Sequence, residues 1–263
     1  MSDGKWGDLG PRAASAVVML VVGAAAIWAG GLVFAALAVA IVALMIWELV
    51  RMIRPGHDSA AVQEAALAAA AFALALWFPG FSLLILGGLV IVLMGRTGRH
   101  MALVGLYTAG IFLAGLGLVW LRLDHGLLAA LWLILVVVAT DVAGYFAGRI
   151  LGGPKFWPRV SPKKTWAGTV AGWIAAALVT LYFAYGLYET PPLALPLTVL
   201  AGVGLSFASQ MGDVAESALK RKMGVKDSST LIPGHGGVMD RFDAMMGASL
   251  LVSVITGLSA INF

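Results

Sequence analysis

Long apolar runs alternate with short polar connections along the whole chain. Nine of these runs approach the roughly 20 residues that an α-helix needs to cross the hydrocarbon core of a bilayer. Glycine or proline occupies tight joints such as Gly30-Gly31 and Pro79-Gly80, where the chain must turn back. The pattern predicts an all-α, polytopic transmembrane helical bundle of about nine helices. The runs lie near residues 13–30, 31–50, 61–78, 80–95, 101–121, 127–148, 167–187, 195–217 and 243–261.

The basic residues predict how these helices cross the membrane. If the nine runs alternate in direction, 16 of the 17 lysines and arginines, Lys5 among them, fall on the side of the N-terminus. Only Arg122 falls on the other side, while the Tyr188 to Pro196 connection and the Asn262-Phe263 end carry none. Because lysine and arginine accumulate in cytoplasmic loops, we predict a cytoplasmic N-terminus and an external C-terminus in a bacterial plasma (inner) membrane.

Composition supports a membrane protein and limits its chemistry. The chain is 61% hydrophobic and 11% charged, which leaves too little polar surface to cover a water-soluble globule. It has no cysteine, so disulfides, thiolate zinc sites and cysteine nucleophiles are excluded. We expect one membrane domain, 1–263, with helices for packing and lipid contact in 1–121 and the catalytic helices and loops in 122–263. The first run is expected to be a retained span, because a second run follows at once.

Acidic residues gather where the eighth run ends and the ninth begins. Five of the 13 acids fall within 31 residues, a density that a simple charge-balanced connection does not require. Helical spacing puts Asp213, Glu216, Ser217 and Lys220 on one face, because positions three, four and seven apart share a side. Hard carboxylate oxygens at two helix ends suit Mg²⁺, which completes its coordination with water and substrate phosphates. The clustered acids are Asp213, Glu216, Asp227, Asp240 and Asp243.

Basic residues and glycines accompany these acids. Glycine lets backbone N–H groups approach an anion closely, and lysine or arginine neutralises phosphate charge. We therefore predict a metal–polyphosphate site in this segment. Each residue taken singly also fits an ordinary solvated connection on the positive side of the membrane, and a lone loop histidine is more often not a ligand. The basic and glycine positions are Lys220, Arg221, Lys226, His235, Gly236, Gly237 and Arg241.

A second charged segment precedes the seventh run. Lys163 and Lys164 are flanked by Ser161 and Thr165, a combination of charge and hydroxyls that suits phosphate binding at a helix start. Attraction of anionic lipid headgroups is the alternative explanation for juxtamembrane lysines. Asp141 in the sixth run is either functional or part of a buried ion pair.

Glycines in the sixth run have a separate explanation. Gly144 and Gly148, four residues apart, are expected to let helices approach closely in the monomer or in a dimer. That packing role is favoured over contact with a ligand.

The stretch from Ser217 to Asp243 closely resembles the signature of the CDP-diacylglycerol synthases, or phosphatidate cytidylyltransferases. The match is continuous over 27 residues, and the runs Ser161 to Gly168 and Asp141 to Arg149 are also similar to that family. One departure is Ala167, where the family commonly has glutamate, so an obligatory acid at that position is in doubt. The earlier helices match only in hydropathy.

The resemblance implies that CMP is transferred from CTP to phosphatidate, giving CDP-diacylglycerol and pyrophosphate in phospholipid biosynthesis. It implies Mg²⁺, with a second cation as an option, and an active site facing the cytoplasm. The catalytic residues would be Asp213, Lys220, Arg221, Lys226, Asp227, His235, Asp240, Arg241 and Asp243. The substrate-binding residues would be Asp141, Arg149, Ser161, Lys163, Lys164, Thr165, Ser217, Gly236 and Gly237. The metal ligands would be Asp213, Asp240 and Asp243, with Glu216 as a further candidate.

Three other functions are compatible with parts of the pattern. A CTP-dependent polyprenol or phytol kinase would transfer the γ-phosphate instead of CMP. An ion-coupled transporter would use Asp141, Asp213 and Glu216 as a relay near the middle of the bilayer. A non-catalytic lipid-binding scaffold would tolerate replacement of Asp240. The expected partners are CTP, phosphatidate and membrane lipid, with a homodimer suggested by glycine-rich helix faces and no nucleic acid.

Overall fold

The computed structural model describes residues 9–187 and 194–260 of the chain. Lys5, residues 188–193 of the uncharged connection and the Asn262-Phe263 end, all used to predict the orientation, lie outside the described residues.

Within these ranges the chain forms nine α-helices, which confirms the all-α prediction. Eight of them, α1 to α8, are long and apolar enough to span a membrane, whereas α9 opens with a charged turn and is not among them. A two-stranded antiparallel hairpin separates α6 from α7. The helices are α1 (Leu9–Ala29), α2 (Gly31–Ile53), α3 (Asp58–Trp77), α4 (Ser82–Thr97), α5 (Met101–Asp124), α6 (Gly126–Ile150), α7 (Trp166–Gly186), α8 (Leu195–Lys222) and α9 (Met239–Ala260). The short elements are the 3₁₀ turns η1 (Pro79–Phe81) and η2 (Gly98–His100) and the strands β1 (Lys155–Trp157) and β2 (Ser161–Thr165).

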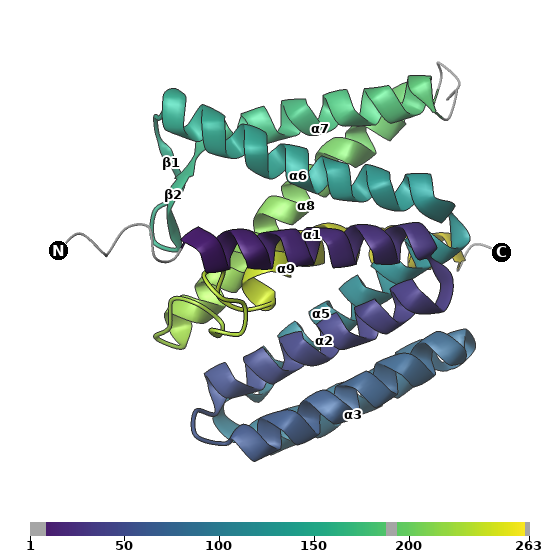
Figure 1. Cartoon of the computed structure of the whole chain (residues 1–263), viewed down its shortest axis with the longest axis vertical. Coiled ribbons are helices and arrows are strands. Elements are labelled where there is room, and N and C mark those ends of the chain that lie inside the picture. Colours follow the sequence, from purple (N-terminus) through teal and green to yellow (C-terminus); the bar gives the residue numbers. More distant parts are fainter. Residues whose placement is uncertain (1–8, 188–193, 261–263) are drawn as a thin grey trace.

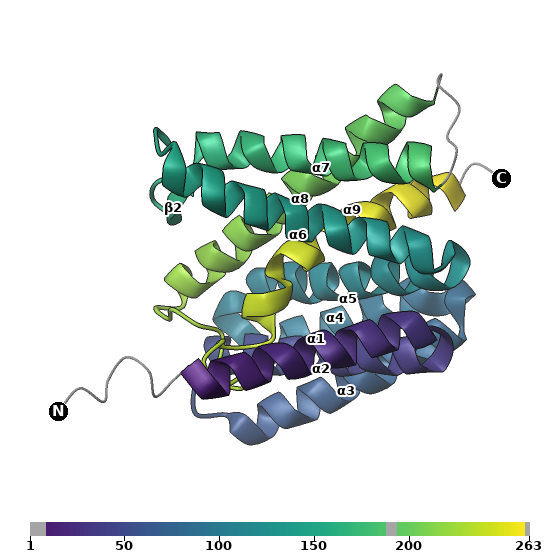
Figure 2. The same ribbon diagram turned by 45° about the horizontal axis from the view of Figure 1, so that its top comes forward.

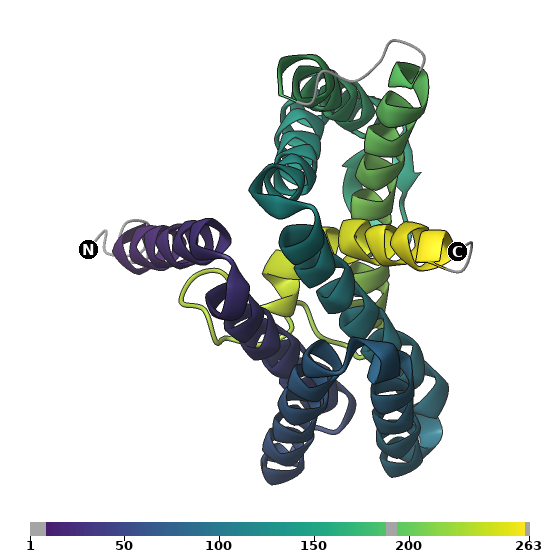
Figure 3. The same ribbon diagram turned by 90° about the vertical axis from the view of Figure 1, so that its right-hand side faces the viewer.

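Helix α9 lies between two groups of helices (Figures 2 and 3). One group is α2 to α5, and the other is α6 to α8; α9 packs against α5 and α8. Glycines permit these approaches: a Cβ at Gly247 of α9 would collide with the backbone of α8, and one at Gly117 of α5 would collide with Ser253. The fold therefore places the start of α9 where both groups meet.

Helix α1 stands apart from the rest of the bundle. Figure 3 shows it projecting from α2 as a separate rod, and only 6% of its most apolar window is buried inside the protein. An apolar helix with so little protein contact is suited to lipid on most of its surface. Its first turns still touch the loop between α8 and α9, because Ser15 Oγ donates to the Pro233 carbonyl at 3.0 Å.

The polar segments are at one end of the bundle. The hairpin, the loop between α8 and α9 and the beginning of α1 all lie at the left of Figure 1, whereas the far end of α9 lies at the right. The α5–α6 connection, which follows Arg122, is at that right-hand end. The two charged segments predicted to carry chemistry thus face the same side, while the cytoplasmic assignment of that side stays a prediction.

Candidate functional site

A pocket of about 550 Å³ opens between α6, β2, α7 and α8. It combines side chains from both charged segments, which are separated by some fifty residues of sequence. Polar groups converge on one concave site, the usual property of a ligand-binding pocket. Six of the predicted site residues line it: Asp141, Arg149, Lys163, Lys164, Thr165 and Asp213.

Close packing of α6 on α7 shapes one wall of this pocket. A Cβ at Gly168 would come within 2.6 Å of the Gly144 carbonyl oxygen, and one at Gly148 would lie 3.0 Å from Thr165 Oγ1. The packing role expected for Gly144 and Gly148 is therefore confirmed. Thr165 is buried and caps α7, because its hydroxyl accepts a hydrogen bond from the Gly168 N–H at 3.2 Å. Its contribution to the pocket is mainly to fix where β2 ends and α7 begins.

Lys164 connects the hairpin to α8. Its ammonium lies 2.7 Å from the Asp213 carboxylate and donates to the Gln210 carbonyl at 3.1 Å. Asp213 also accepts a hydrogen bond from Ser217 Oγ at 3.3 Å, one helical turn along α8. The Lys164–Asp213 pair places a phosphate-binding type of side chain directly beside a predicted metal ligand.

Arg149 is oriented by its neighbour in the pocket. Its Nη1 donates to the Tyr145 hydroxyl at 2.8 Å, and both side chains line the cavity. Lys163 is exposed, and Ser161 begins β2 outside the lining. The cavity therefore presents Arg149, Lys163 and Lys164 as its cationic groups.

Three carboxylates interact electrostatically across the pocket wall. Asp141 on α6 and Asp213 on α8 repel each other, and Asp243 on α9 is repelled by both. Such mutual repulsion favours a bound cation. Among the residues that the structure describes, no group of three or more acidic or histidine side chains is assembled as a complete metal site. The donor set fits a Mg²⁺ ion that takes a few protein oxygens and completes its shell from water and substrate phosphates.

Asp240 belongs to a different network, at the start of α9. Its Oδ2 accepts hydrogen bonds from the Ser228 N–H and hydroxyl, both at 2.8 Å, and from the Gly237 N–H at 2.7 Å. Its Oδ1 lies 2.6 Å from the Lys220 ammonium. Burial raises the pKa of Asp240, but the Lys220 contact and these hydrogen bonds outweigh it and lower the pKa to about 2. Its side chain, 5% exposed, organises the loop, and its metal-binding role stays a prediction.

Lys220 and Glu216 complete this network inside the protein. The Lys220 ammonium is also paired with Glu216, one turn before it on α8. The Glu216 side chain is fully buried, whereas the Asp213 side chain retains 35% of its exposure. The shared helix face predicted from spacing thus divides into two pairs, Asp213 with Ser217 toward the pocket and Glu216 with Lys220 toward α9. Of these acids, Asp213 is the accessible one.

The two signature glycines lie against carboxylates of the protein, and their substrate-binding role stays a prediction. Gly237 does not offer its N–H to an open anion site, because that N–H is bound to Asp240. A Cβ at Gly237 would collide with Ser228 Oγ and the Glu48 carboxylate, so close approach of these side chains requires glycine. Gly236 has a positive φ of 81°, and a Cβ there would lie 2.7 Å from Asp240. Both glycines make room for carboxylates of the protein itself.

The remaining predicted residues lie on the loop between α8 and α9 or on the helix ends beside it, outside the lining of the pocket. His235 Nδ1 is 2.9 Å from Ser15 Oγ of α1, and its carbonyl accepts from Arg241 Nε at 2.9 Å. The first contact ties the tip of the loop to α1, and the second ties it to the start of α9. Arg221, Lys226 and Asp227 are exposed.

Glu48, on α2, is a contact of the signature loop that the sequence analysis missed. Its side chain is completely buried, and it accepts four hydrogen bonds from the signature loop and the start of α9. The rule that intramembrane acids are functional candidates would have selected it, because it lies within the second apolar run. Glu48 is far from the loop in sequence, so the pattern of residues alone could not predict this contact.

The sequence profile of the cytidylyltransferase family matches residues 11–258, nearly the whole chain. The chain belongs to the cytidylyltransferase family. The resemblance seen in the signature is thereby confirmed, and it extends to the helices that matched only in hydropathy.

Curated relatives in this family include several bacterial phosphatidate cytidylyltransferases. The protein of that name from Brucella suis biovar 1 (strain 1330) is 42% identical over 171 residues, which are 62% of this chain and 60% of the relative. Those from Staphylococcus saprophyticus and Haemophilus influenzae are 39% and 40% identical over 143 residues. These matches cover 54% of both chains in the first case, and 50% of this chain and 49% of the relative in the second. The chain thus spans between about half and 60% of the length of these relatives.

Proposed function

We propose that this protein is a phosphatidate cytidylyltransferase of a bacterial plasma membrane, with its pocket on the cytoplasmic side. The observation that carries the proposal is the pocket in which Lys164 of β2 meets Asp213 of α8. A cationic group and an acidic group that are adjacent there match the two needs of the reaction, phosphate binding and metal binding. The names of the curated relatives support the same reaction.

In the proposed reaction an oxygen of the phosphatidate phosphate attacks the α-phosphorus of CTP. A new P–O bond forms, the bond from the α-phosphorus to the bridging oxygen breaks, and pyrophosphate leaves with that oxygen. The attacking phosphate is already anionic near neutral pH, so no strong general base is needed. Alignment and charge neutralisation are therefore the main contributions of the protein.

Asp213, together with Asp141 or Asp243, would hold Mg²⁺, with or without a second cation, and water and substrate phosphates would complete its shell. The metal, when bound, neutralises the triphosphate and the developing charge on pyrophosphate. Lys163, Lys164 and Arg149 would bind and orient the phosphate groups in the pocket. On binding, a substrate phosphate competes with Asp213 for the Lys164 ammonium, which frees the carboxylate.

The lipid chains have a suitable surface beside the pocket. An apolar groove of about 460 Å³ runs between α6 and α7 and includes Val138, Val142 and Leu178. Val142 directly follows Asp141, so the groove and the polar pocket are adjacent on the same two helices. A phosphatidate molecule would place its phosphate near Lys164 and its acyl chains along this groove, within the bilayer.

Labelled CTP separates the candidate reactions. Purified protein in phosphatidate-containing micelles with Mg²⁺ should transfer label to lipid from [α-³²P]CTP and release pyrophosphate. Transfer from [γ-³²P]CTP to a lipid alcohol would instead identify a polyprenol or phytol kinase. Label in neither product would exclude both enzymes and favour a transporter or a lipid-binding scaffold.

The membrane side can be tested because the chain has no cysteine. A cysteine introduced at exposed Lys155 should react with an impermeant maleimide only after the bacterial inner membrane is opened. Reaction in intact spheroplasts would place the hairpin outside and contradict the proposal. Cross-linking of the same protein in membranes tests the predicted homodimer.

A further inference from the structure

Four hydrogen-bond donors converge on the two carboxylate oxygens of Glu48. Oε1 accepts from Ser229 Oγ at 2.6 Å and from the Val238 N–H at 2.8 Å. Oε2 accepts from the Met239 N–H at 2.7 Å and lies 3.0 Å from Ser228 Oγ, whose single hydrogen is shared between Glu48 and Asp240. Every donor comes from the loop between α8 and α9 or from the first residue of α9, although Glu48 itself is on α2.

These contacts make Glu48 an anionic cap for α9 supplied by another helix. The first N–H groups of a helix have no partner within it, and a negative charge beside them is favourable. Together with the Gly237 N–H, which binds Asp240, three successive backbone N–H groups at 237–239 are bound by carboxylates. The backbone leading into the helix therefore has little freedom.

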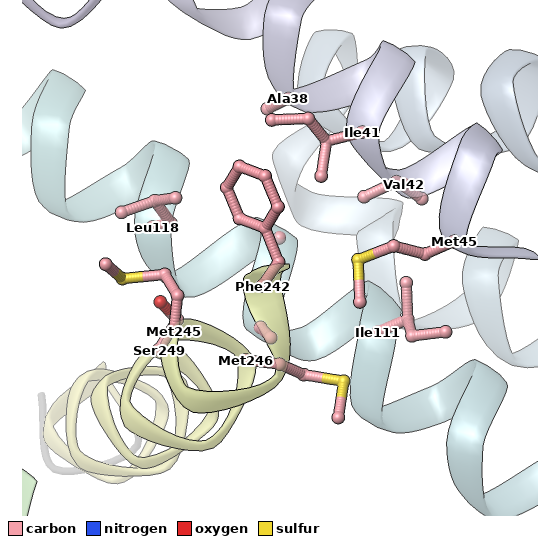
Figure 4. A pocket seen from close by; sticks show the side chains of 12 residues that line it. Ala38, Ile41, Val42, Met45, Ile111, Leu118, Phe242, Met245, Met246 and Ser249 are labelled. Atoms are coloured by element: carbon pink, nitrogen blue, oxygen red, sulfur yellow. The ribbon is translucent and has the colours of Figure 1, made fainter. Parts of the chain in front are cut away.

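Apolar packing holds the same turn from the other side. Figure 4 shows Phe242 of α9 pointing between Ile41 and Val42 of α2 and Leu118 of α5. Met45, about one turn before Glu48 on α2, lies on the same side of this pocket. Glu48 and Phe242 thus attach the start of α9 to α2 by polar and apolar contacts, respectively.

We propose that Glu48 is a positioning residue for the reaction, which holds α9 so that Asp240 and Asp243 face α8. This inference rests on the proposed cytidylyltransferase function. Glu48 contacts the loop and the helix start, and it acts on substrate only through them. A displacement of about 1 Å in a reactive group costs on the order of 100-fold in rate, so a loosened α9 start would be visible in kcat.

The number of acceptors distinguishes positioning from simple filling of space. Glu48→Gln keeps the shape but replaces one acceptor oxygen with an N–H₂ group, which would face a backbone N–H. The serine hydroxyls can rotate, but the backbone N–H cannot, and it would remain buried without a partner. Glu48→Asp keeps both acceptor oxygens and loses one methylene, so it preserves the charge at the cost of packing.

The test compares both variants in the full chain, in detergent micelles with CTP, Mg²⁺ and phosphatidate. We expect kcat per folded molecule to fall roughly 100-fold in Glu48→Gln and less in Glu48→Asp, with the KM for phosphatidate little changed. Hydrogen exchange at Val238 and Met239, measured without substrate or metal, should be faster in Glu48→Gln. A role in packing alone predicts the reverse order, with Glu48→Gln the more active variant.

Glu64 of α3 supplies the matched control, because it is a buried acid paired with Arg54 and does not touch the loop. Glu64→Gln should leave exchange at 238–239 and kcat per folded molecule unchanged. Unchanged exchange and kcat in Glu48→Gln, or greater activity in it than in Glu48→Asp, would overturn the inference. If the wild-type chain transfers no CMP, the proposed function fails, and faster exchange in Glu48→Gln still reports whether Glu48 holds the loop.

Discussion

Lys164 of β2 and Asp213 of α8 form an ion pair of 2.7 Å at the edge of the pocket. Together with the Lys164 hydrogen bond to the Gln210 carbonyl, this contact connects the hairpin directly to the helix that ends in the signature segment. In the proposed site, Lys164 thus takes the place of a cation beside Asp213, and Asp213 takes the place of a substrate phosphate beside Lys164. In the proposed reaction both groups are needed, and substrate binding would separate them.

Lys164→Gln is expected to lower kcat/KM by roughly 10- to 100-fold, because one charge-assisted contact to phosphate is lost. Initial rates with labelled CTP at varied phosphatidate measure the effect. Lys155→Gln, an exposed lysine of β1 in the same hairpin, is the control and should retain wild-type kinetics. Equal losses in the two variants would indicate only general attraction of anionic lipid.

Asp213→Asn should raise the Mg²⁺ concentration needed for half-maximal activity and reduce kcat, because an amide is a weaker ligand for a hard cation than a carboxylate. Titration of the enzyme with Mg²⁺ after treatment with EDTA measures both quantities. Asp58→Asn removes an exposed acid of α3 and should leave the titration unchanged. An unaltered Mg²⁺ requirement in Asp213→Asn would remove Asp213 from the proposed ligands.

Asp240→Asn is expected to abolish turnover while the protein remains inserted in the membrane. The neutral amide loses the Lys220 pair: if its oxygen keeps the loop donors at the Oδ2 position, its N–H₂ group faces the Lys220 ammonium, and two donors oppose each other. The measurements are the turnover of the variant and the amount of the variant found in the membrane fraction. Retained turnover would contradict the role assigned to this network and would favour the non-catalytic scaffold.

The lowered pKa of Asp240 predicts that the stability of the fold depends on pH. The folded pKa of about 2 lies below the ordinary value of 3.8, so ionised Asp240 stabilises the fold above about pH 4 and this contribution is lost as the pH falls toward 2. The stability difference between wild type and Asp240→Asn should therefore be constant near neutral pH and shrink in acid. Thermal unfolding of both proteins in detergent, from neutral pH down to about pH 2, measures this stability difference. A stability difference that changes around pH 7 would indicate another titrating group.

Gly237→Ala should loosen the loop, because the added methyl group would collide with Ser228 and Glu48. Overpacking of this kind typically lowers stability by about 1–3 kcal/mol. Here the loop and the start of α9 would be destabilised. Limited proteolysis and kcat report the change. Gly88→Ala, at a position of α4 with open space around it, should be neutral in both assays.

The sequence predicted the helices well because their signal is local. The seventh run, predicted at 167–187, corresponds to α7 at Trp166–Gly186, and the short fourth run corresponds to α4 at Ser82–Thr97. The length of an apolar run is enough to predict such a helix, and that length can be seen from consecutive residues alone. The hairpin of β1 and β2 was not predicted, because three- and five-residue strands carry little periodic signal.

The site was predicted in part, for a related reason. Spacing along one helix located Asp213 and Lys220, and the cluster of basic residues located Lys164. The division of the acids between a pocket and a buried network depends on how α8 and α9 cross, which spacing within one helix does not contain. Glu48 shows the limit most clearly, because its partners follow 180 or more residues later in the chain.

The Glu48 contacts also change what the first 121 residues contribute. Sequence hydropathy assigned that part of the chain to packing and lipid contact, yet α2 supplies the acid on which the signature loop is anchored. The two parts are consequently not interchangeable modules. If Glu48 has the proposed positioning role, a chimaera that joined the first helices of a distant relative to α6–α9 would keep a membrane bundle but would function only if the transplanted α2 offered an acid at the depth of Glu48.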